Sequence, residues 1–140
     1  MIKEFRGQYY FLSNFYTSKV TYKGLSYMNN EAAFQAQKVL DLDGKKAFCT
    51  LDAKDAKRQG RRVKLRSDWE SVKDNIMYEI VLAKFSQNYT LKEKLLNTGD
   101  KILIEGNKWN DTYWGVCNGK GMNKLGTILM KVREELKHNK

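Results

Sequence analysis

A stretch rich in aromatic, glycine and asparagine residues, Trp109 to Gly126, carries the side chains best suited to bind a ligand. Its two tryptophans, Trp109 and Trp114, flank its one carboxylate, Asp111. Large aromatic side chains are unfavourable on a surface, whereas glycine and asparagine add little to an apolar core. Rigid rings, one acid and a flexible backbone before a helix suit a pocket for a planar ring and a phosphate. The alternative is a glycine-rich connector whose tryptophans are buried.

A second polar set, Glu31, Gln35 and Lys38, follows helical spacing at i, i+4 and i+7 and therefore shares one helix face. The same segment carries Phe34 and several alanines, so this polar stripe is a candidate for function. The alternative is structural: Glu31 stabilises the helix N-terminus through the helix dipole, and Lys38 is solvated.

Several kinds of chemistry are excluded by composition. The only histidine is His138, which excludes Ser-His-Asp, Cys-His and His-based zinc sites. Cys49 and Cys117 fit no metal or redox spacing and are most simply free thiols. Gly115 to Lys120 imitates a phosphate-binding loop, but its spacer is one residue short. Catalysis, if present, must use carboxylates, lysines or hydroxyls.

The net charge of +10, from 26 Lys and Arg against 16 Asp and Glu, favours anionic partners. Nucleic acid and phosphorylated small molecules both fit, and a merely soluble basic surface is the alternative. No apolar run approaches the ~20 residues of a membrane span. The N-terminal residues also lack the apolar block of a signal peptide, so we expect a cytoplasmic protein without a membrane partner.

The elements that would position these residues are short strands and amphipathic helices. Tyr9 to Phe11 fits a strand, Lys19 to Tyr27 predicts a hairpin that turns at Lys23-Gly24, and Lys101 to Glu105 predicts another strand. The predicted helices run from Asn29 or Asn30 through Leu40, from Asp43 to Leu51, from Asp52 to Gly60, from Ser67 to Gln87, from Thr90 to Asn97 and from Asn123 to Leu136. Capping boxes are predicted for Ser67 with Glu70 and for Thr90 with Glu93.

Several of these segments, in this order, together resemble the NADAR, or YbiA-like, family. The matching segments are Phe11-Leu12-Ser13-Asn14-Phe15, Glu31 with Phe34 through Lys38, Arg66 through Glu70, Met77, Lys84-Phe85, Asn97-Thr98-Gly99, Asp111 with Trp114-Gly115, and Gly119 through Gly126. The resemblance covers nearly the whole chain. It implies one compact, predominantly helical α+β domain over residues 1–140, with a few short strands and with neither a metal nor a cofactor.

The resemblance also implies an enzyme, since members of this family are N-glycosidases. One branch hydrolyses early phosphorylated intermediates of riboflavin synthesis. Another removes ADP-ribose from guanine in nucleic acid, in some cases as the antidote to an ADP-ribosyltransferase toxin. Both substrates join C1 of a phosphorylated ribose to an exocyclic amine.

The residues at the family's acidic positions, Glu31 and Asp111, become the catalytic candidates. We expect Asp111 to stabilise positive charge at C1 or to orient the ribose, and Glu31 to handle the proton or the water; the reverse assignment is nearly as well supported. A second route uses Lys38, which could form a covalent imine with an opened ribose while Glu31 shuttles protons.

The resemblance further implies a binding set around these groups. Trp69 and Trp114 would sandwich the base, and stacking of this kind contributes roughly 1–3 kcal/mol. The remaining binding candidates are Ser13 and Asn14 for sugar or base edges, Arg61, Arg66, Lys120 and the backbone from Gly119 to Asn123 for phosphate, and Phe15, Gln35 and Gly115 without an assigned contact.

Two non-catalytic interpretations remain. A module that binds ADP-ribose or nucleotides without turnover would not need Glu31, Asp111 and Lys38 together. A nonspecific nucleic-acid binder would show steep salt dependence and indifference to Asp111→Asn.

Overall fold

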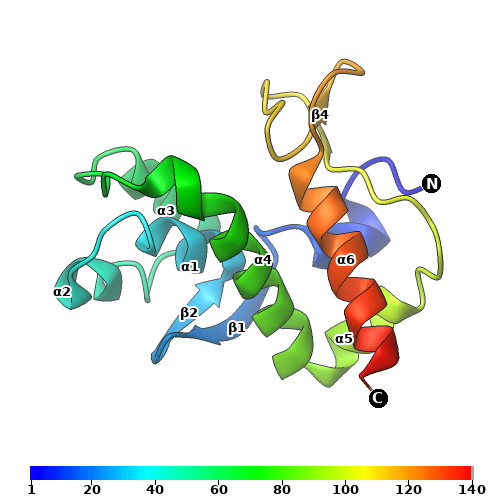
Figure 1. Ribbon diagram of the computed structural model, residues 1–140, viewed down its shortest axis with the longest axis horizontal. Helices are drawn as coiled ribbons and strands as arrows, with labels where there is room; N and C mark the ends of the chain where they lie inside the picture. The colour runs from blue at the N-terminus through cyan, green and yellow to red at the C-terminus, as the bar shows by residue number, and fades with distance from the viewer. Residues whose placement is uncertain (140) are drawn as a thin grey trace. The chain divides into compact units, whose positions relative to one another are not determined.

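The computed structural model describes residues 1–139 and consists mainly of helices with a few short strands (Figure 1), which confirms the predicted α+β, predominantly helical class. The chain forms two compact units. We call Asn14–Gln87 the central unit, and Met1–Ser13 together with the chain from Asn88 onward the terminal unit. Within residues 1–139, every helix is too short or too polar to cross a lipid bilayer.

The central unit opens with the predicted hairpin. Strand β1 (Thr17–Tyr22) pairs antiparallel with β2 (Leu25–Asn29). The two turn residues, Lys23 and Gly24, have φ angles of 49° and 85°. Positive φ at both central positions is typical of the type I′ turn that joins twisted strands, so the hairpin and its turn are confirmed.

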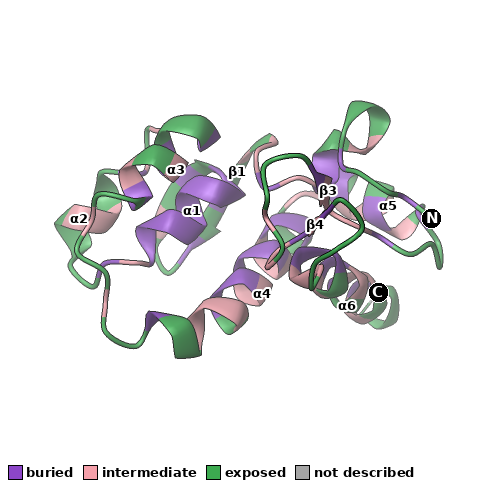
Figure 2. Ribbon diagram, turned by 90° about the horizontal axis from the view of Figure 1, so that it is seen from above, coloured by how far each residue is buried: buried purple, intermediate pink, exposed green. Residues whose placement is uncertain are grey.

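Helix α1 (Asn30–Ala36) follows directly and is buried along its whole length (Figure 2). The Asn29 side-chain oxygen accepts a hydrogen bond from the Ala32 amide at 2.7 Å, which confirms the N-cap. The helix ends before the predicted Leu40. The amides of Lys38 and Val39 bond to carbonyls three residues back, and such tighter bonds end an α-helix.

Helices α2 (Leu42–Lys46) and α3 (Ala53–Gly60) come next. The Asp52 carboxylate caps α3 and accepts from the Asp55 amide at 2.8 Å, so this helix starts and ends where it was predicted, from Asp52 to Gly60. The helix predicted from Asp43 to Leu51 begins one residue earlier, at Leu42, because Asp41 caps it, and it is shorter because it ends at Lys46. Helix α3 packs against α1.

Helix α4 (Trp69–Gln87) is the long core helix that the apolar pattern predicts, and it packs on β1 and α1. Its buried face includes Ile76, Ile80 and Phe85. The predicted capping box is wrong. The helix begins two residues after Ser67, and the Glu70 carboxylate pairs with Lys73 at 2.6 Å.

The terminal unit begins with η1 (Gly7–Leu12), a 3-10 helix where the sequence predicted a strand over Tyr9 to Phe11. Bonds from the amides of Tyr9 and Ser13 to carbonyls three residues back favour the turn geometry over an extended chain. Helix α5 (Tyr89–Leu96) is capped by Asn88, whose side-chain oxygen accepts from the Leu91 amide at 3.0 Å, so the predicted cap at Thr90 is wrong.

Two short parallel strands, β3 (Gly106–Asn107) and β4 (Val116–Cys117), complete the terminal unit with helix α6 (Lys124–His138). Helix α6 carries the predicted apolar stripe, including buried Leu125 and Leu129. The strand predicted over Lys101 to Glu105 is wrong. Only Leu103 forms a bridge, with Ile2, because the N-terminal segment offers a single residue to pair with.

Candidate functional site

Glu31 lies in the first turn of α1 and is a buried, firmly held carboxylate. Its backbone amide donates to the Asn14 carbonyl at 3.0 Å, which ties the helix start to the segment after Ser13. Its side chain accepts a 2.6 Å hydrogen bond from Gln35 Nε2, one turn along the helix. The predicted i, i+4 pairing of Glu31 with Gln35 is therefore present, and it fixes the carboxylate in one orientation.

Lys38 follows one turn after Gln35 and is partly buried. Its Nζ lies 3.5 Å from the Gly60 carbonyl oxygen and 6.0 Å from the centre of the Trp69 ring. Burial lowers the pKa of Lys38 below its ordinary value of 10.5, the Glu31 carboxylate acts in the opposite direction, and the positive charges of Arg61 and Lys73 lower it further. A lysine with a lowered pKa can be neutral and nucleophilic near physiological pH.

Arg61 and Lys73 provide a test of whether the lowered pKa of Lys38 matters for activity. Arg61→Gln removes a charge that lowers the pKa of Lys38, so that pKa should rise. If neutral Lys38 reacts, the ascending limb of the pH profile of kcat/KM should move to higher pH. Lys73→Gln should move it in the same direction, whereas Lys54→Gln, an exposed cation with no such effect on Lys38, serves as the control.

Lys73 is a residue that the sequence analysis missed. It lies one turn after Trp69 on α4, with its ammonium mostly covered and paired to Glu70. The spacing from Trp69 was the available signal, but only the packing of α4 on α1 shows that its charge acts on Lys38.

Gly60 is a second missed residue, and its role is steric. A methyl group built at Gly60 would lie 1.9 Å from Gln35 Oε1. The Gln35 side chain therefore occupies the space that any larger residue would need. In the sequence Gly60 looked only like a helix end.

We expect Gly60→Ala to cost about 1–3 kcal/mol of unfolding free energy, the usual range for an overpacked core. Displacing Gln35 should also weaken its 2.6 Å bond to Glu31 and lower activity. Urea denaturation measures the first effect. In a Gln35→Ala background the same change should cost much less, and equal costs in both backgrounds would contradict the steric account.

Trp69 and Arg66 are both held by neighbouring side chains, Trp69 by burial and Arg66 by an ion pair. Trp69 is 5% exposed, and its ring packs at 5.0 Å from that of Phe34. The Arg66 guanidinium forms a two-point ion pair with Asp68, at 2.6 and 3.0 Å. A phosphate role for Arg66 would therefore require competition with Asp68, whereas exposed Arg61 has no ion pair among the described residues.

Asn14 and Phe15 open the central unit, while Ser13 closes η1 in the terminal unit. The Asn14 side-chain amide lies 3.4 Å from Met77 Sδ, and its carbonyl holds Glu31. The ring of Phe15 lies 5.9 Å from Lys57 Nζ. Asn14 thus supports the acid as well as being a predicted ligand contact.

Lys84, which lies on α4 and belongs to the Lys84-Phe85 segment shared with the NADAR family, also has a lowered pKa. It is 2% exposed, and burial lowers its pKa to about 7. Its Nζ lies 5.4 Å from the centre of the Tyr16 ring. Because Lys84 is almost fully covered, Lys38 is the more accessible of the two amines.

Asp111 lies in the terminal unit, in the loop between β3 and β4. Its Oδ1 accepts from the backbone amides of Tyr113 and Trp114 at 3.1 and 2.9 Å. The loop is held by the Asn107 side chain, which donates to the Asp111 carbonyl at 2.9 Å and accepts from the Asp111 amide at 3.1 Å. Asn107, which the sequence analysis missed, thus fixes the loop that presents this carboxylate.

The other predicted residues of this segment differ in how firmly their surroundings hold them. Gly115 has no room for a side chain, because an added methyl would lie 1.7 Å from Glu105 Oε2. The Asn123 side chain accepts from the Glu105 amide and donates to the Leu103 carbonyl, both at 2.9 Å. Trp114 packs edge-on against Tyr113 at 4.8 Å. Lys120 is exposed and has no side-chain partner among the described residues.

The candidates fall into two groups. Glu31, Gln35, Lys38 and Trp69 gather in the central unit, with Arg61 acting on Lys38. Asp111, Trp114, Gly115, Lys120 and Asn123 belong to the terminal unit. It stays a prediction that Glu31 and Asp111 act on the same C1–N bond. It also stays a prediction that Trp69 and Trp114 stack on the two faces of one base.

Comparison with known proteins identifies the family. The sequence profile described as NADAR domain matches residues 2–137, across both units. The chain belongs to the NADAR family. N-glycosidase YbiA of Escherichia coli K12 is 41% identical over 128 residues, which are 89% of this chain and 79% of that protein. The NMR structure of E. coli YbiA has a TM-score of 0.86 at 35% identity, covering 99% of this chain and 88% of that one.

Other NADAR relatives carry related names. A riboflavin biosynthesis protein of Vibrio vulnificus is 40% identical over 133 residues, 92% of this chain but 36% of its own length. An N-glycosidase of Nostoc punctiforme is 48% identical over 75 residues, 53% of this chain and 47% of that protein. The predicted class of enzyme, a glycosidase, is confirmed by these relatives.

Proposed function

We propose that this NADAR protein hydrolyses the C1–N bond between a phosphorylated ribose and an exocyclic amine of a guanine or pyrimidinone base. The observation that carries the proposal is the Lys38 ammonium, whose pKa is lowered by burial and by Arg61 and Lys73, beside the buried Glu31 carboxylate. The names of the relatives support the reaction class, and the lysine chemistry supports a route.

The route through Lys38 begins when the ring oxygen takes up a proton and the C1–O bond of the ribosylamine breaks, which leaves a protonated imine between C1 and the base nitrogen. The neutral Lys38 Nζ attacks C1 and a C1–Nζ bond forms. Glu31 accepts one proton from Nζ and passes it to the base nitrogen, so the C1–N bond breaks, the base leaves as a neutral amine, and a protonated imine remains between C1 and Nζ. Water then adds to C1 and displaces the lysine, which releases a ribose that closes again, neutral Lys38 and the proton taken up at ring opening.

A direct route remains open beside it. There C1–N cleavage passes through an oxocarbenium-like state, stabilised by a fixed carboxylate, and water adds to C1 without a covalent intermediate. Asp111 is the candidate for the charge and Glu31 for activation of the water. In that route Lys38 is a binding residue, and its pKa would not control the rate.

In the central unit the phosphate would be bound by exposed Arg61, with Arg66 contributing where Asp68 releases it, and the base would stack on Trp69. In the terminal unit the corresponding candidates are Lys120 for the phosphate and Trp114 for the base. Phosphate contacts from arginine forks and exposed lysines are strong in affinity and weak in selectivity. Discrimination between substrates would then rest on the base and on the group beyond the phosphate.

The test compares two substrates by mass spectrometry. One is a DNA oligomer carrying ADP-ribosylated guanine; the other is an aminopyrimidinone N-riboside 5-phosphate of the kind found early in riboflavin synthesis. Release of ADP-ribose or of ribose 5-phosphate, lost in Glu31→Gln, supports the proposal and names the branch. An ADP-ribosyltransferase encoded beside the gene would favour the first substrate. Binding of both without turnover would contradict the proposal and favour a binding module.

A further inference from the structure

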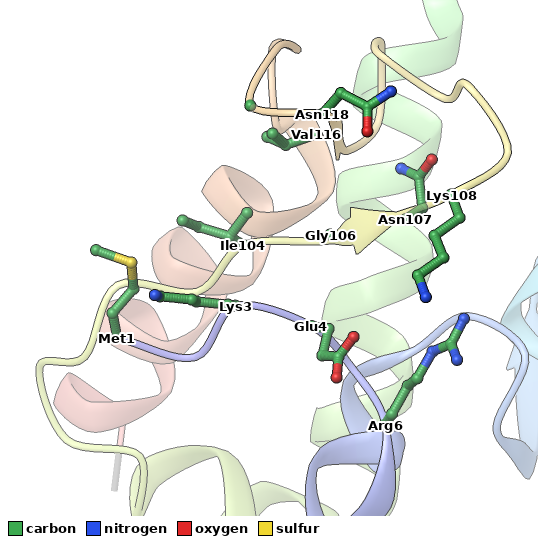
Figure 3. Close-up of a pocket in the computed structure, with 11 residues that line it drawn as sticks. Met1, Lys3, Glu4, Arg6, Ile104, Gly106, Asn107, Lys108, Val116 and Asn118 are labelled. Carbon is green, nitrogen blue, oxygen red and sulfur yellow. The ribbon is translucent and has the colours of Figure 1, made fainter.

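The terminal unit contains a pocket that none of the chemistry above uses. It has a volume of about 420 Å³, within the range of small-molecule sites (Figure 3). Three segments enclose it: the N-terminal segment, the chain from Ile104 to Lys108, and the turn at Asn118-Gly119 after β4. It lies entirely within one compact unit, so its walls are fixed by that unit alone.

The floor of the pocket is held by backbone contacts. The Ile104 amide donates to the Ile2 carbonyl at 2.9 Å. Gly106 lies so close to the N-terminal segment that a methyl group added there would be 2.2 Å from the Lys3 carbonyl oxygen. Such close approach of two backbones excludes a side chain at Gly106, one of the residues that line the pocket.

The charge of the lining is positive and not neutralised. The side chains of Lys3, Arg6 and Lys108 carry three positive charges against one negative charge from Glu4, so the side chains sum to +2, and the Met1 amino group is a further cation of the lining residues. None of these four side chains forms an ion pair within 4 Å among the described residues. In Figure 3 the Arg6 and Lys108 side chains extend toward the same region of the pocket. A phosphomonoester, with about −1.5 to −2 charges at neutral pH, matches that balance.

Charge is not uniform over the pocket lining, and this limits the class of ligand that fits. Ile104 and Met1 lie on the side away from Arg6 and Lys108 (Figure 3), so the apolar side chains and these two cations are at different ends, with the third cation, Lys3, beside Met1. The Glu4 carboxylate accepts hydrogen bonds but repels a phosphate. In this otherwise cationic pocket it is therefore suited to accept hydrogen bonds from ribose hydroxyls. Inorganic phosphate would use neither feature.

We propose that this pocket is a binding site for a ribonucleoside monophosphate. Arg6 and Lys108 bind the phosphate, Glu4 accepts from the ribose hydroxyls, and Ile104 with Met1 contacts the base. The pocket also includes Asn107, whose side chain holds the backbone of Asp111. A bound nucleotide therefore contacts the residue that orders the Trp109–Asp111 loop, and occupancy should change tryptophan fluorescence.

The test measures binding rather than turnover, and Arg61→Gln separates this pocket from the phosphate-binding residues proposed for the glycosidase. Adenosine monophosphate is titrated against the full chain by calorimetry and tryptophan fluorescence. Arg6→Gln with Lys108→Gln should raise Kd at least about 10-fold, since hydrogen bonds to charged groups are lost. Lys46→Gln with Lys54→Gln removes the same net charge from exposed positions in the central unit and should leave Kd unchanged. Arg61→Gln should also leave it unchanged.

Selectivity gives the second arm. Glu4→Gln should reduce the preference for the ribonucleotide over its 2′-deoxy form, and inorganic phosphate should bind more weakly than either. Equal binding of phosphate and nucleotide would reduce the pocket to a simple anion site and overturn the proposal. So would an unchanged Kd in the Arg6, Lys108 variant, or equal losses in the matched control. Thermal unfolding of each variant confirms that the fold is retained.

Discussion

Lys38→Met is expected to lower kcat/KM by roughly 10⁴-fold, the scale of loss when a residue that forms a covalent intermediate is removed. The physical reason is that the amine itself, and not its charge, makes the bond to C1. Burial beside Trp69 lowers the pKa of Lys38, which raises its neutral fraction near physiological pH. Steady-state kinetics on whichever phosphorylated riboside is turned over provides the measurement.

Two controls separate the nucleophile from a phosphate-binding cation. Lys38→Arg keeps the positive charge but cannot form the imine, so it should be as inactive as Lys38→Met under the covalent route and nearly active under the direct one. Borohydride reduction during turnover should add one ribose phosphate, or one ADP-ribose, to the peptide that contains Lys38. An adduct on the peptide that contains Lys84, or no adduct at all, would contradict the assignment of Lys38 as the nucleophile.

The parts of the fold that follow from local chemistry were predictable from the sequence. Lys23-Gly24 between alternating strands specified the hairpin and its turn, because few residue pairs tolerate positive φ at both positions. Asn29 and Asp52 supplied capping oxygens at the starts of α1 and α3. These signals depend on neighbours within a few residues, and tertiary contacts had little power to override them.

The predictions that depended on distant partners were less successful. Lys101 to Glu105 has the composition of a strand, but only Leu103 finds a partner, the N-terminal Ile2. Thr90 is a good cap by type, yet Asn88 is two residues earlier and caps α5 instead. Pairing partners and competing caps are decided by tertiary packing, which a local pattern does not contain.

The same division holds in the candidate site. Helical spacing predicted that Glu31 and Gln35 meet, and they do, at 2.6 Å. Nothing local to Gly60 or Asn107 indicates that one makes room for Gln35 and the other holds Asp111. Packing against other segments creates both roles.

Glu31→Gln is expected to lower kcat by roughly 10²–10⁴-fold, the usual contribution of a positioned proton-transfer group. The amide keeps the shape of the carboxylate but cannot accept and return the proton between Lys38 and the departing amine. Asp111→Asn is the matched change in the terminal unit. Under the imine route it should cost less than Glu31→Gln, and under the direct route the two losses should be similar.

The pH profile separates proton transfer from simple electrostatic tuning at Glu31. The carboxylate raises the pKa of Lys38, so its removal lowers that pKa and moves the ascending limb of kcat/KM to lower pH. If tuning were the only role, Glu31→Gln would therefore be at least as active as the wild type at acidic pH, because more of Lys38 would be neutral. A loss that persists across the whole profile, together with the shifted limb, assigns both effects to one carboxylate: it transfers the proton, and it opposes the burial that makes Lys38 reactive.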